Sequence, residues 1–305
     1  MSRPFRFGVN LISPAPADEW RAKCRRAEQL GYDVLLVPDH LGMPAPFPAL
    51  VAAAAATSGP RVGTFVLNAG FWNPALLARE VATTDALTGG RLELGLGTGY
   101  VRAEHESAGL PWGSPRERVD RLRHTVEELV RLLGSTDLPH SRLRSSGGTP
   151  TPDPVQRPRV PLMIGGGGDR MLRLAAEHAD IVAFTGARSL PDGTLVPVTD
   201  EEFGERVARY AKSATGREEP AERNLLVQLV VVTDDPGAAV REWLPYFPQL
   251  SEEQVLGLPT ALVGTLEEIV GRVRALRERH GITYLTVLEP NMEVFAPVMA
   301  ALRDG

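Results

Sequence analysis

Short apolar stretches alternate with longer stretches of helical periodicity along almost the whole chain. The short stretches are nearly continuous runs of apolar residues, which is typical of strands covered on both faces. We predict eight such strands, at Phe5–Ile12, Val34–Val37, Val62–Asn68, Arg91–Leu96, Pro161–Ile164, Asp180–Thr185, Leu225–Val232 and Tyr284–Glu289.

Several of the longer stretches carry helix start and stop signals. Asn73 and Ser114 are each followed by proline, the pattern of a capping residue with proline at the first helical position. Thr265 and Glu268 have the spacing of a capping box, and Gly31 is placed to end a helix. We predict helices at Ala17–Leu30, Pro48–Ala56, Pro74–Leu87, Pro115–Leu133, Arg170–Glu177, Glu201–Tyr210 and Leu266–His280.

The alternation of strands and helices predicts a parallel sheet of the α/β class. A count of eight strands favours a closed (β/α)8 TIM barrel over an open doubly wound sheet, and we expect residues 1–305 to form this one domain. Three segments fit neither helix nor strand and are predicted as loop insertions or lids. They are Asp137–Arg159, Gly186–Thr199 and Trp243–Val263, the last with a short turn at Glu252–Leu256.

The composition narrows the range of partners. With a net charge of −5 and a pI of about 5.8, the chain offers no basic field for nucleic acid. No apolar stretch is long enough to span a bilayer, and Met1–Gly8 has no run typical of a signal peptide. The single cysteine, Cys24, lies in a helical pattern and is predicted as a small buried side chain. We therefore expect a cytoplasmic protein that binds neither membranes nor nucleic acid.

In a barrel, functional residues lie on the loops after the carboxyl ends of the strands. His40 is the only one of six histidines at such an end, and Asp39 is placed either to orient it or to cap the next segment. The other candidates at predicted strand ends are Asn68, Thr98, Gly99, Tyr100, Gly165, Gly166, Gly167, Gly168, Thr185, Glu289 and Asn291.

Four consecutive glycines, Gly165–Gly168, lie between a predicted strand and a predicted helix. Such a loop lets backbone N–H groups approach a phosphate, with the positive helix end behind it; the alternative is a flexible turn. Arg170 is a candidate for a further contact to the anion, whereas Asp169, as the N-cap, would compete for the same donors. A second glycine run, Gly95–Gly99, either lets a flat ligand approach the backbone or forms a tight turn.

Other barrel chemistries lack their residues. Gly8–Ser13, at the end of the first strand, has no histidine, and one histidine cannot furnish a His-rich metal site. Asp39 and Glu289 are the only well-placed carboxylates for a glycosidase, and no nucleophile elbow occurs. Neither glycine run matches the dinucleotide fingerprint. The remaining interpretation is a pocket for a phosphate-tailed cofactor that itself carries the chemistry, with no metal.

A set of motifs spread over nearly the whole chain resembles the bacterial luciferase-like monooxygenase superfamily. Within it, the chain most resembles the actinobacterial enzymes that use the deazaflavin coenzyme F420. The resemblance implies an oxidoreductase that transfers a hydride between F420 and a small organic substrate, and it implies a homodimer. The motifs are Phe7-Gly8-Val9, Pro38-Asp39-His40, Asn73-Pro74, Gly95-Leu96-Gly97-Thr98-Gly99 and Ile164-Gly165-Gly166-Gly167.

The resemblance also implies roles for individual residues. Asp39 and His40 would touch the ring system, with His40 near the carbon that exchanges the hydride. Phe65 and Val66 would form a bulge in the third strand behind the ring, often with a non-proline cis peptide bond. The ring and the ribityl chain would be lined by Asn68, Thr98 and Gly99, and the phosphate end would be held by Gly165, Gly166, Gly167, Gly168 and Thr185.

The chain departs from the related sugar-phosphate dehydrogenases in two places. They carry a glutamate directly after Gly-Thr-Gly, where this chain has Tyr100, and this argues against glucose 6-phosphate as the substrate. The tryptophan expected shortly after His40 is also absent. We predict His40 as the proton donor or acceptor and Tyr100 as a second donor. An apolar substrate pocket, or else ordinary packing, accounts for Met43, Phe47, Phe71, Trp72 and Trp112.

Two alternatives stay open. The first is an FMN-dependent luciferase-like monooxygenase with oxygen as co-substrate. The second is a flavin- or deazaflavin-binding protein without turnover, because the loss of the glutamate at position 100 can mark lost catalysis.

Overall fold

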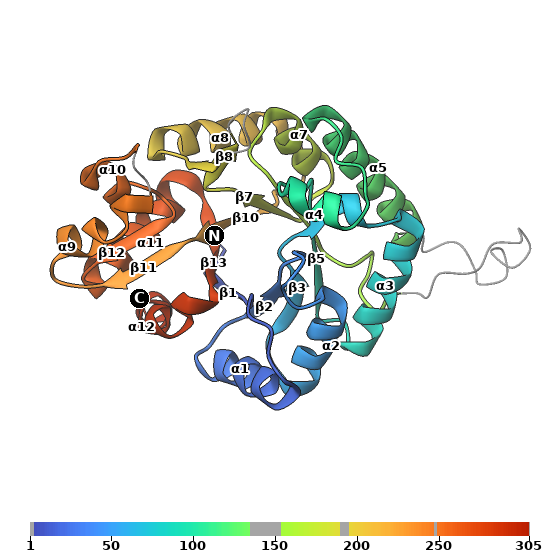
Figure 1. The fold of residues 1–305 in the computed structure, drawn as a ribbon, viewed down its shortest axis with the longest axis horizontal. Helices are drawn as coiled ribbons and strands as arrows, with labels where there is room; N and C mark the ends of the chain where they lie inside the picture. The colour runs from blue at the N-terminus through green and yellow to red at the C-terminus, as the bar shows by residue number, and fades with distance from the viewer. Residues whose placement is uncertain (1–2, 135–153, 190–194, 247–248, 305) are drawn as a thin grey trace, which may run out of the picture.

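The computed structural model describes residues 3–134, 154–189, 195–246 and 249–304. Its centre is a closed ring of parallel strands with helices around the outside (Figure 1). Strands β3 and β4 follow each other in one position of the ring, and the pairing of β3 with β5 closes it, so nine strands fill eight positions. The ring strands are β1 (Arg6–Asn10), β2 (Val34–Val37), β3 (Arg61–Thr64), β4 (Leu67–Asn68), β5 (Leu92–Gly97), β6 (Leu162–Gly165), β7 (Ile181–Phe184), β10 (Glu222–Val227) and β13 (Ile282–Leu288). The predicted TIM barrel is confirmed.

The third position of the ring is interrupted, which corrects the single strand predicted at Val62–Asn68. The peptide bond between Phe65 and Val66 is cis, and strand geometry stops at Thr64 and resumes at Leu67. Both halves pair with β5, so the interruption is a bulge within one strand position. The predicted bulge with a non-proline cis bond is therefore confirmed.

The helices after Asn73, Ser114 and Thr265 begin where the capping signals predict, whereas the helix predicted from Pro48 begins at Pro46. Ser114, Thr199 and Thr265 each complete a capping box, and Asn73 accepts backbone N–H bonds at the start of its helix. The helices α4 and α12 are additions to the prediction, because neither has a strong start signal. The helices outside the ring are α1 (Ala17–Gln29), α2 (Pro46–Ala56), α3 (Pro74–Leu87), α4 (Arg102–Ser107), α5 (Pro115–Leu133), α7 (Asp169–His178), α8 (Asp200–Ser213), α11 (Leu266–His280) and α12 (Met292–Arg303).

The predicted strand Leu225–Val232 is wrong in its second half. After β10, the chain leaves the ring, and β11 (Leu229–Val232) pairs in parallel with β12 (Ala261–Gly264). The backbone N–H groups of Gln228 and Leu229 both donate to the Thr260 carbonyl, which fixes the exit. An apolar run does not indicate which neighbouring strand it will pair with. The prediction therefore treated β10 and β11 as one strand.

The segment Trp243–Val263 was predicted as irregular apart from a short turn at Glu252–Leu256, and α10 occupies those residues. The segment also contains η2 (Leu244–Tyr246) and most of β12, which the prediction missed. With α9 (Pro236–Arg241), these elements form a unit beside the ring, at the left of Figure 1. A small apolar core of its own supports the unit, made by Leu229, Val240, Val255, Leu258, Ala261 and Val263.

The two other segments predicted as irregular have different outcomes. Gly186–Thr199 contains an antiparallel hairpin of β8 (Ala187–Ser189) and β9 (Leu195–Pro197), which corrects the prediction. In Asp137–Arg159, residues 137–153 lie outside the described residues.

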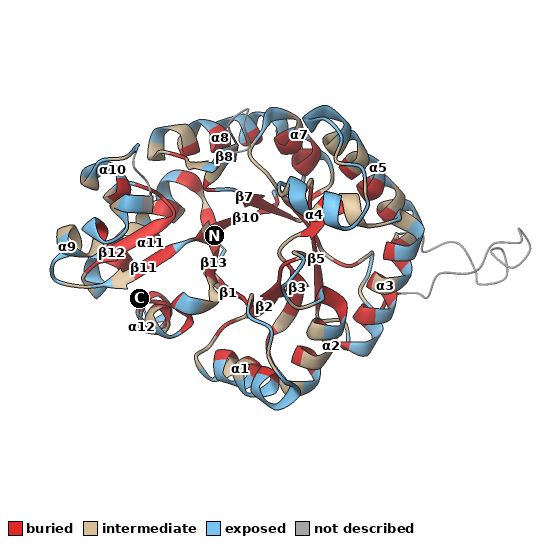
Figure 2. Cartoon of the chain, viewed as in Figure 1, coloured by how far each residue is buried: buried red, intermediate tan, exposed pale blue. Residues whose placement is uncertain are grey.

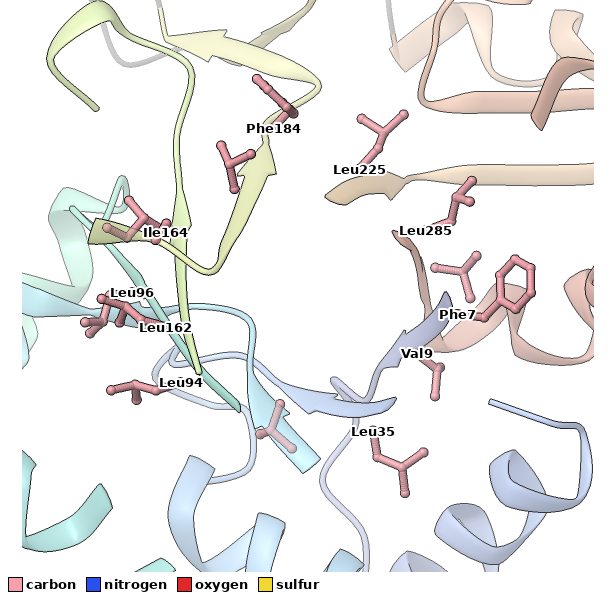
Figure 3. Close-up of a cluster of buried hydrophobic side chains, with 14 of the residues drawn as sticks. Phe7, Val9, Leu35, Leu94, Leu96, Leu162, Ile164, Phe184, Leu225 and Leu285 are labelled. Atoms are coloured by element: carbon pink, nitrogen blue, oxygen red, sulfur yellow. The ribbon is translucent and has the colours of Figure 1, made fainter. Parts of the chain in front are cut away.

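Most residues of the ring strands are buried, on both faces of the sheet (Figure 2). One set of positions packs with the helices in the main core, and Figure 3 shows Phe7, Leu35, Leu94, Leu162 and Leu285 among them. The intervening positions point to the inside of the ring, where they make a smaller cluster of Val34, Leu36, Met163, Ile181, Ala183 and Tyr284. The strands are thus covered on both faces, as their apolar runs predicted.

Cys24 is fully buried in the main core, and desolvation raises the pKa of its thiol to about 12. The predicted small buried side chain is confirmed. Within the described ranges, no helix combines the length and the apolar composition that crossing a membrane requires.

Candidate active site

His40 follows β2 at the carboxyl end of the ring, and a carboxylate holds it in place. Its Nδ1 lies 2.9 and 3.1 Å from the two carboxylate oxygens of Glu104 on α4. A carboxylate only accepts hydrogen bonds, so Nδ1 is the donor and Nε2 is left for a ligand. The two side chains keep 22% and 14% of their surface exposed, so the pair is sheltered but reachable.

Tyr100 packs against the other side of this pair. Its ring meets the His40 ring edge to face, with centroids 5.2 Å apart. Desolvation and the nearby carboxylate of Glu104 raise the pKa of Tyr100 above its ordinary value. The hydroxyl therefore keeps its proton at neutral pH and can donate it in a hydrogen bond.

Asp39 takes neither of the two roles that the sequence left open. Its Oδ2 accepts hydrogen bonds from the backbone N–H of Asn68, at 3.1 Å, and from Nε1 of Trp72, at 2.9 Å. Burial raises the pKa of Asp39, and these two donors partly offset that effect. Asp39 thus fixes the end of β4 and the orientation of an aromatic side chain.

Asn68 is held from two sides. Its Oδ1 accepts from the backbone N–H of Gly70, and its Nδ2 lies 2.9 Å from Nε2 of His105. His105 is fully buried, and its Nδ1 lies 3.1 Å from the carbonyl oxygen of Pro111. Because that carbonyl only accepts, Nδ1 of His105 donates to it and Nε2 accepts from Asn68.

Helix α4 therefore supplies two site residues, Glu104 and His105, that the sequence analysis missed. The helix has only six residues and no apolar periodicity, so no helix signal marks it. Only their position in the sequence could have indicated them. Both residues follow the fourth predicted strand, and the segments after strands form the functional end of a barrel.

The bulge explains most of the glycine run at the end of β5. A Cβ on Gly95 would lie 2.1 Å from the backbone oxygen of Thr64, and one on Gly97 would lie 2.8 Å from the Val66 side chain. Gly99 has a φ of +70°, a conformation that favours glycine. Gly95 and Gly97 thus make room for the bulge, and Gly99 forms the tight turn.

The loop Gly165–Gly168 leads into α7 without a side-chain cap. Asp169 is the first helical residue, and its carboxylate lies 3.5 Å from Arg209 instead of capping the helix. The N–H groups of the first turn are therefore not occupied by the Asp169 side chain, contrary to the competition that we expected.

Arg206 on α8 lies against this loop, whereas Arg170 turns away to Asp120 on α5. A Cβ on Gly167 would lie 2.5 Å from Nη1 of Arg206 and 3.1 Å from Oγ1 of Thr185. Arg206 is 7% exposed and donates to the backbone oxygens of Thr185 and Ala187. Burial lowers its pKa below the ordinary arginine value, which reflects a sheltered charge. The sequence signal was an arginine on the apolar face of α8, three residues after Phe203.

The predicted aromatic wall divides into two groups. Met43, Phe47 and Trp72 line a cavity of about 290 Å³ together with Asp39 and His40. The rings of Phe71 and Trp112 instead pack on His105, each with centroids 5.0 Å apart. The first group can face a ligand, and the second supports the residue that holds Asn68.

The rim of the ring is open to solvent. Among the predicted cofactor residues, Gly168 and Thr185 are exposed, whereas Asn68 is buried. Those with partial exposure are Asp39, His40, Phe65, Val66, Thr98, Gly99, Gly165, Gly166 and Gly167. Two other strand-end candidates have structural contacts, because Glu289 pairs with Lys23 and Asn291 donates to the Gln228 carbonyl. No group of three or more metal-ligating side chains occurs in the part of the chain that the structure describes.

A family model described as luciferase-like monooxygenase matches residues 1–258. The F420-dependent glucose-6-phosphate dehydrogenase of Intrasporangium calvum is 32% identical over 252 residues, which are 76% of this chain and 71% of that protein. The 5,10-methylenetetrahydromethanopterin reductase of Archaeoglobus fulgidus is 25% identical over 252 residues, 78% of this chain and 74% of that protein.

Two solved structures show the same fold. An F420-dependent secondary alcohol dehydrogenase in complex with an F420-acetone adduct superposes with a TM-score of 0.73 at 18% identity, covering 99% of this chain and 100% of that one. A long-chain alkane monooxygenase superposes with a TM-score of 0.75 at 14% identity, covering 100% and 92%.

Proposed function

Because the chain belongs to the luciferase-like monooxygenase family, we propose that it is an oxidoreductase that uses coenzyme F420 and exchanges a hydride with a small organic substrate. The observation that carries the proposal is the placement of His40. It lies at the open rim of the barrel, held by Glu104, on the same rim as the bulge and the glycine loop.

The residues of the rim fit a phosphate-tailed, three-ring cofactor. At the phosphate end, Arg206 and Thr185 lie directly against the loop, because Gly167 has no side chain to keep them away. The adjoining first turn of α7 offers N–H donors without a side-chain cap, so an anion there meets donors and a cation together. At the ring end, the bulge at Phe65 and Val66 is partly exposed and can support a flat ligand.

When bound, F420 would supply the hydride-transfer chemistry, and the side chains would bind the cofactor and exchange the proton. We assign Asp39, Phe65, Val66, Asn68, Thr98 and Gly99 to the ring and the ribityl chain, and Gly165, Gly166, Gly167, Gly168, Thr185 and Arg206 to the phosphate end. Asp39 acts chiefly through its hydrogen bonds, which hold Trp72 and the end of β4 in place.

His40 exchanges a proton with the substrate oxygen through Nε2. Glu104 fixes the ring orientation by accepting a hydrogen bond from Nδ1, which leaves Nε2 facing the ligand. Tyr100 is a second hydrogen-bond donor, because its ring lies against His40 and its hydroxyl is protonated at neutral pH. Glu104, four residues after Tyr100, thus returns a carboxylate to a site where the expected glutamate is missing.

Fluorescence titration tests the proposal. We expect F420 to bind more tightly than FMN, and Arg206→Met to weaken F420 binding by roughly tenfold or more, since a charge-assisted hydrogen bond is lost. The deazaflavin fragment without phosphate should bind wild type and Arg206→Met equally. Lys212→Met, an exposed change of the same charge near the end of α8, serves as the control. Absence of F420 binding to the wild type would refute the proposal.

The same titration decides between the cofactors. Tight FMN binding with weak F420 binding would favour the FMN-dependent monooxygenase instead. Tight F420 binding without hydride transfer to any tested acceptor would favour a binding protein without turnover. We also propose that the protein is a homodimer, as the family resemblance implies, and light scattering of the purified protein measures its mass. The single cysteine, which is buried and free, fits a cytoplasmic location.

A further inference from the structure

The cavity beside His40 has a distinctive chemical lining. It holds about 290 Å³ and lies between the loop after β2, the start of α2, and α3. This volume is at the small end of the range for ligand pockets. His40 belongs to its lining, so a molecule in the cavity lies next to the residue that we assign to proton exchange.

Several parts of the lining offer no free hydrogen-bond donor. Three prolines, Pro44, Pro46 and Pro48, line the cavity and have no backbone N–H. Trp72 has one side-chain donor, and that donor is already engaged with Asp39 at 2.9 Å. The Trp72 ring meets Phe47 edge to face, with centroids 5.3 Å apart. The aromatic surfaces therefore present carbon to a ligand.

The charges of the lining are acidic. Asp39 and Glu80 line the cavity, and Glu104 lies directly behind His40. None of the described residues that line the cavity is an arginine or a lysine. Glu80 pairs with Arg79 at 3.3 Å, but Arg79 is not part of the lining. Because proteins commonly bind phosphate with arginine or lysine, this lining lacks the cationic side chains that would favour a phosphate ester, and its carboxylates repel one.

We propose that the cavity beside His40 binds an uncharged organic substrate with an apolar body and one oxygen directed at His40, and that it excludes phosphate esters and other anions. That the molecule bound here is the substrate rests on the proposed function, whereas the selectivity of the cavity does not. The relative named as a glucose-6-phosphate dehydrogenase would then differ from this chain in substrate class, despite 32% identity.

Ligand-observed NMR measures this selectivity directly. The probes are cyclohexanone, a neutral ring with one carbonyl oxygen, and glucose 6-phosphate, each titrated with and without F420. We expect saturable binding of cyclohexanone and at least tenfold weaker binding of glucose 6-phosphate. Equal or tighter binding of glucose 6-phosphate, or no saturable binding of cyclohexanone, would overturn the proposal.

A charge placed on the rim locates the effect in this cavity. Met43 is 36% exposed and lines the cavity, so Met43→Lys adds a cation there without disturbing the core. We expect it to weaken cyclohexanone binding and to strengthen glucose 6-phosphate binding severalfold. Leu87→Lys is the control, because Leu87 is 66% exposed and lies at the end of α3, outside the lining. Identical behaviour of the two variants would contradict the proposed site.

The two proposals fail separately. If F420 does not bind but cyclohexanone is selected over glucose 6-phosphate, the cofactor assignment is wrong and the cavity assignment stands. If F420 binds and glucose 6-phosphate is preferred, the cofactor assignment stands and the substrate class is wrong.

Discussion

The carboxylates Glu93 and Glu222 at one end of the barrel and Asp39 at the other have different kinds of hydrogen-bond partner. At the amino ends of the strands, Arg6 pairs with Glu93 and Glu222, each at 2.5 Å, and Arg61 pairs with Glu93 at 2.6 Å. We call these four residues the amino-end layer. Glu93 and Glu222 are 3% and 6% exposed, so each buried carboxylate has an arginine partner. At the carboxyl ends, Asp39 is held only by neutral donors.

The difference indicates that the amino ends of the strands serve stability, whereas the carboxyl ends serve function. In the amino-end layer, burial works against the charge of Arg6, but Glu93 and its neighbours raise the pKa of Arg6 above the ordinary arginine value. In this layer the arginines are engaged with buried carboxylates, so the layer serves to close the barrel. At the rim, His40 and Tyr100 keep exposed atoms and unused hydrogen-bonding capacity, as binding requires.

The largest effect is expected from His40→Ala at the rim. If His40 exchanges the proton, turnover should fall by about 10²–10⁴-fold, because that is the usual contribution of a positioned acid or base. F420 affinity should stay nearly unchanged, as should the thermal midpoint, since the side chain lies at the open end. Steady-state kinetics and fluorescence titration measure the two quantities. Full activity in this variant would show that His40 is not catalytic.

Glu93→Gln is the matching change in the amino-end layer. It keeps the volume of the side chain but leaves Arg6 and Arg61 with one carboxylate between them. We expect the free energy of unfolding to fall by about 3 kcal/mol, because breaking a buried ion pair leaves uncompensated charge. Urea denaturation measures this loss. F420 binding of the folded fraction should not change, and a variant as stable as the wild type would contradict the contrast between the two ends.

Local signals in the sequence were sufficient for most of the fold. Capping residues such as Ser114 and Thr265 act on their own first turn, so they are legible without knowledge of the tertiary structure. The departure of β11 from the ring was not legible, because the apolar run continues across Gln228 and only the Thr260 carbonyl determines where the chain turns. Strand existence was thus predictable, whereas strand pairing was not.

The site was predictable to a similar extent. Asp39 and His40 follow from their position after a strand, a rule that needs only the chain order. Glu104 is 64 residues from His40 and reaches it because β2 and β5 lie on either side of the third strand position. Arg206 likewise reaches the glycine loop from a distant helix, α8. The sequence of α8 shows an apolar face but does not indicate what that face contacts. The family resemblance supplied the bulge at Phe65 and Val66, which no periodicity indicated.

Glu104→Gln sharpens the comparison with a smaller effect at the rim. If Glu104 positions His40, its replacement should lower kcat by about tenfold and leave KM and F420 affinity nearly unchanged. The nitrogen chemical shifts of the His40 ring should also change, because the amide no longer enforces a donor at Nδ1.

A control for this change lies on the same helix. Glu106 pairs with Arg102 at 2.7 Å and is 60% exposed, so Glu106→Gln removes the same charge from α4 away from His40. It should alter neither kcat nor the His40 signals. A loss of activity shared by both variants would point to helix stability instead of positioning.

Asp39→Asn has the smallest expected effect and tests the rim through pH. Burial raises the pKa of Asp39 in the folded protein, so its charged form costs stability near neutral pH. An asparagine oxygen can accept from Asn68 and Trp72 as Oδ2 does, without the charge. The variant should therefore equal or exceed the wild type in stability at pH 7.

The pH dependence should distinguish the two proteins. As the pH falls through the raised pKa of Asp39 toward the unfolded value of about 3.9, the free energy of unfolding of the wild type should rise relative to that of Asp39→Asn. Below that value both states bind the proton. Urea denaturation between about pH 4.5 and pH 7.5 measures the difference. If the variant is less stable at pH 7 and the gap narrows on acidification, the carboxylate is stabilised by its surroundings, and the rim resembles the amino-end layer after all.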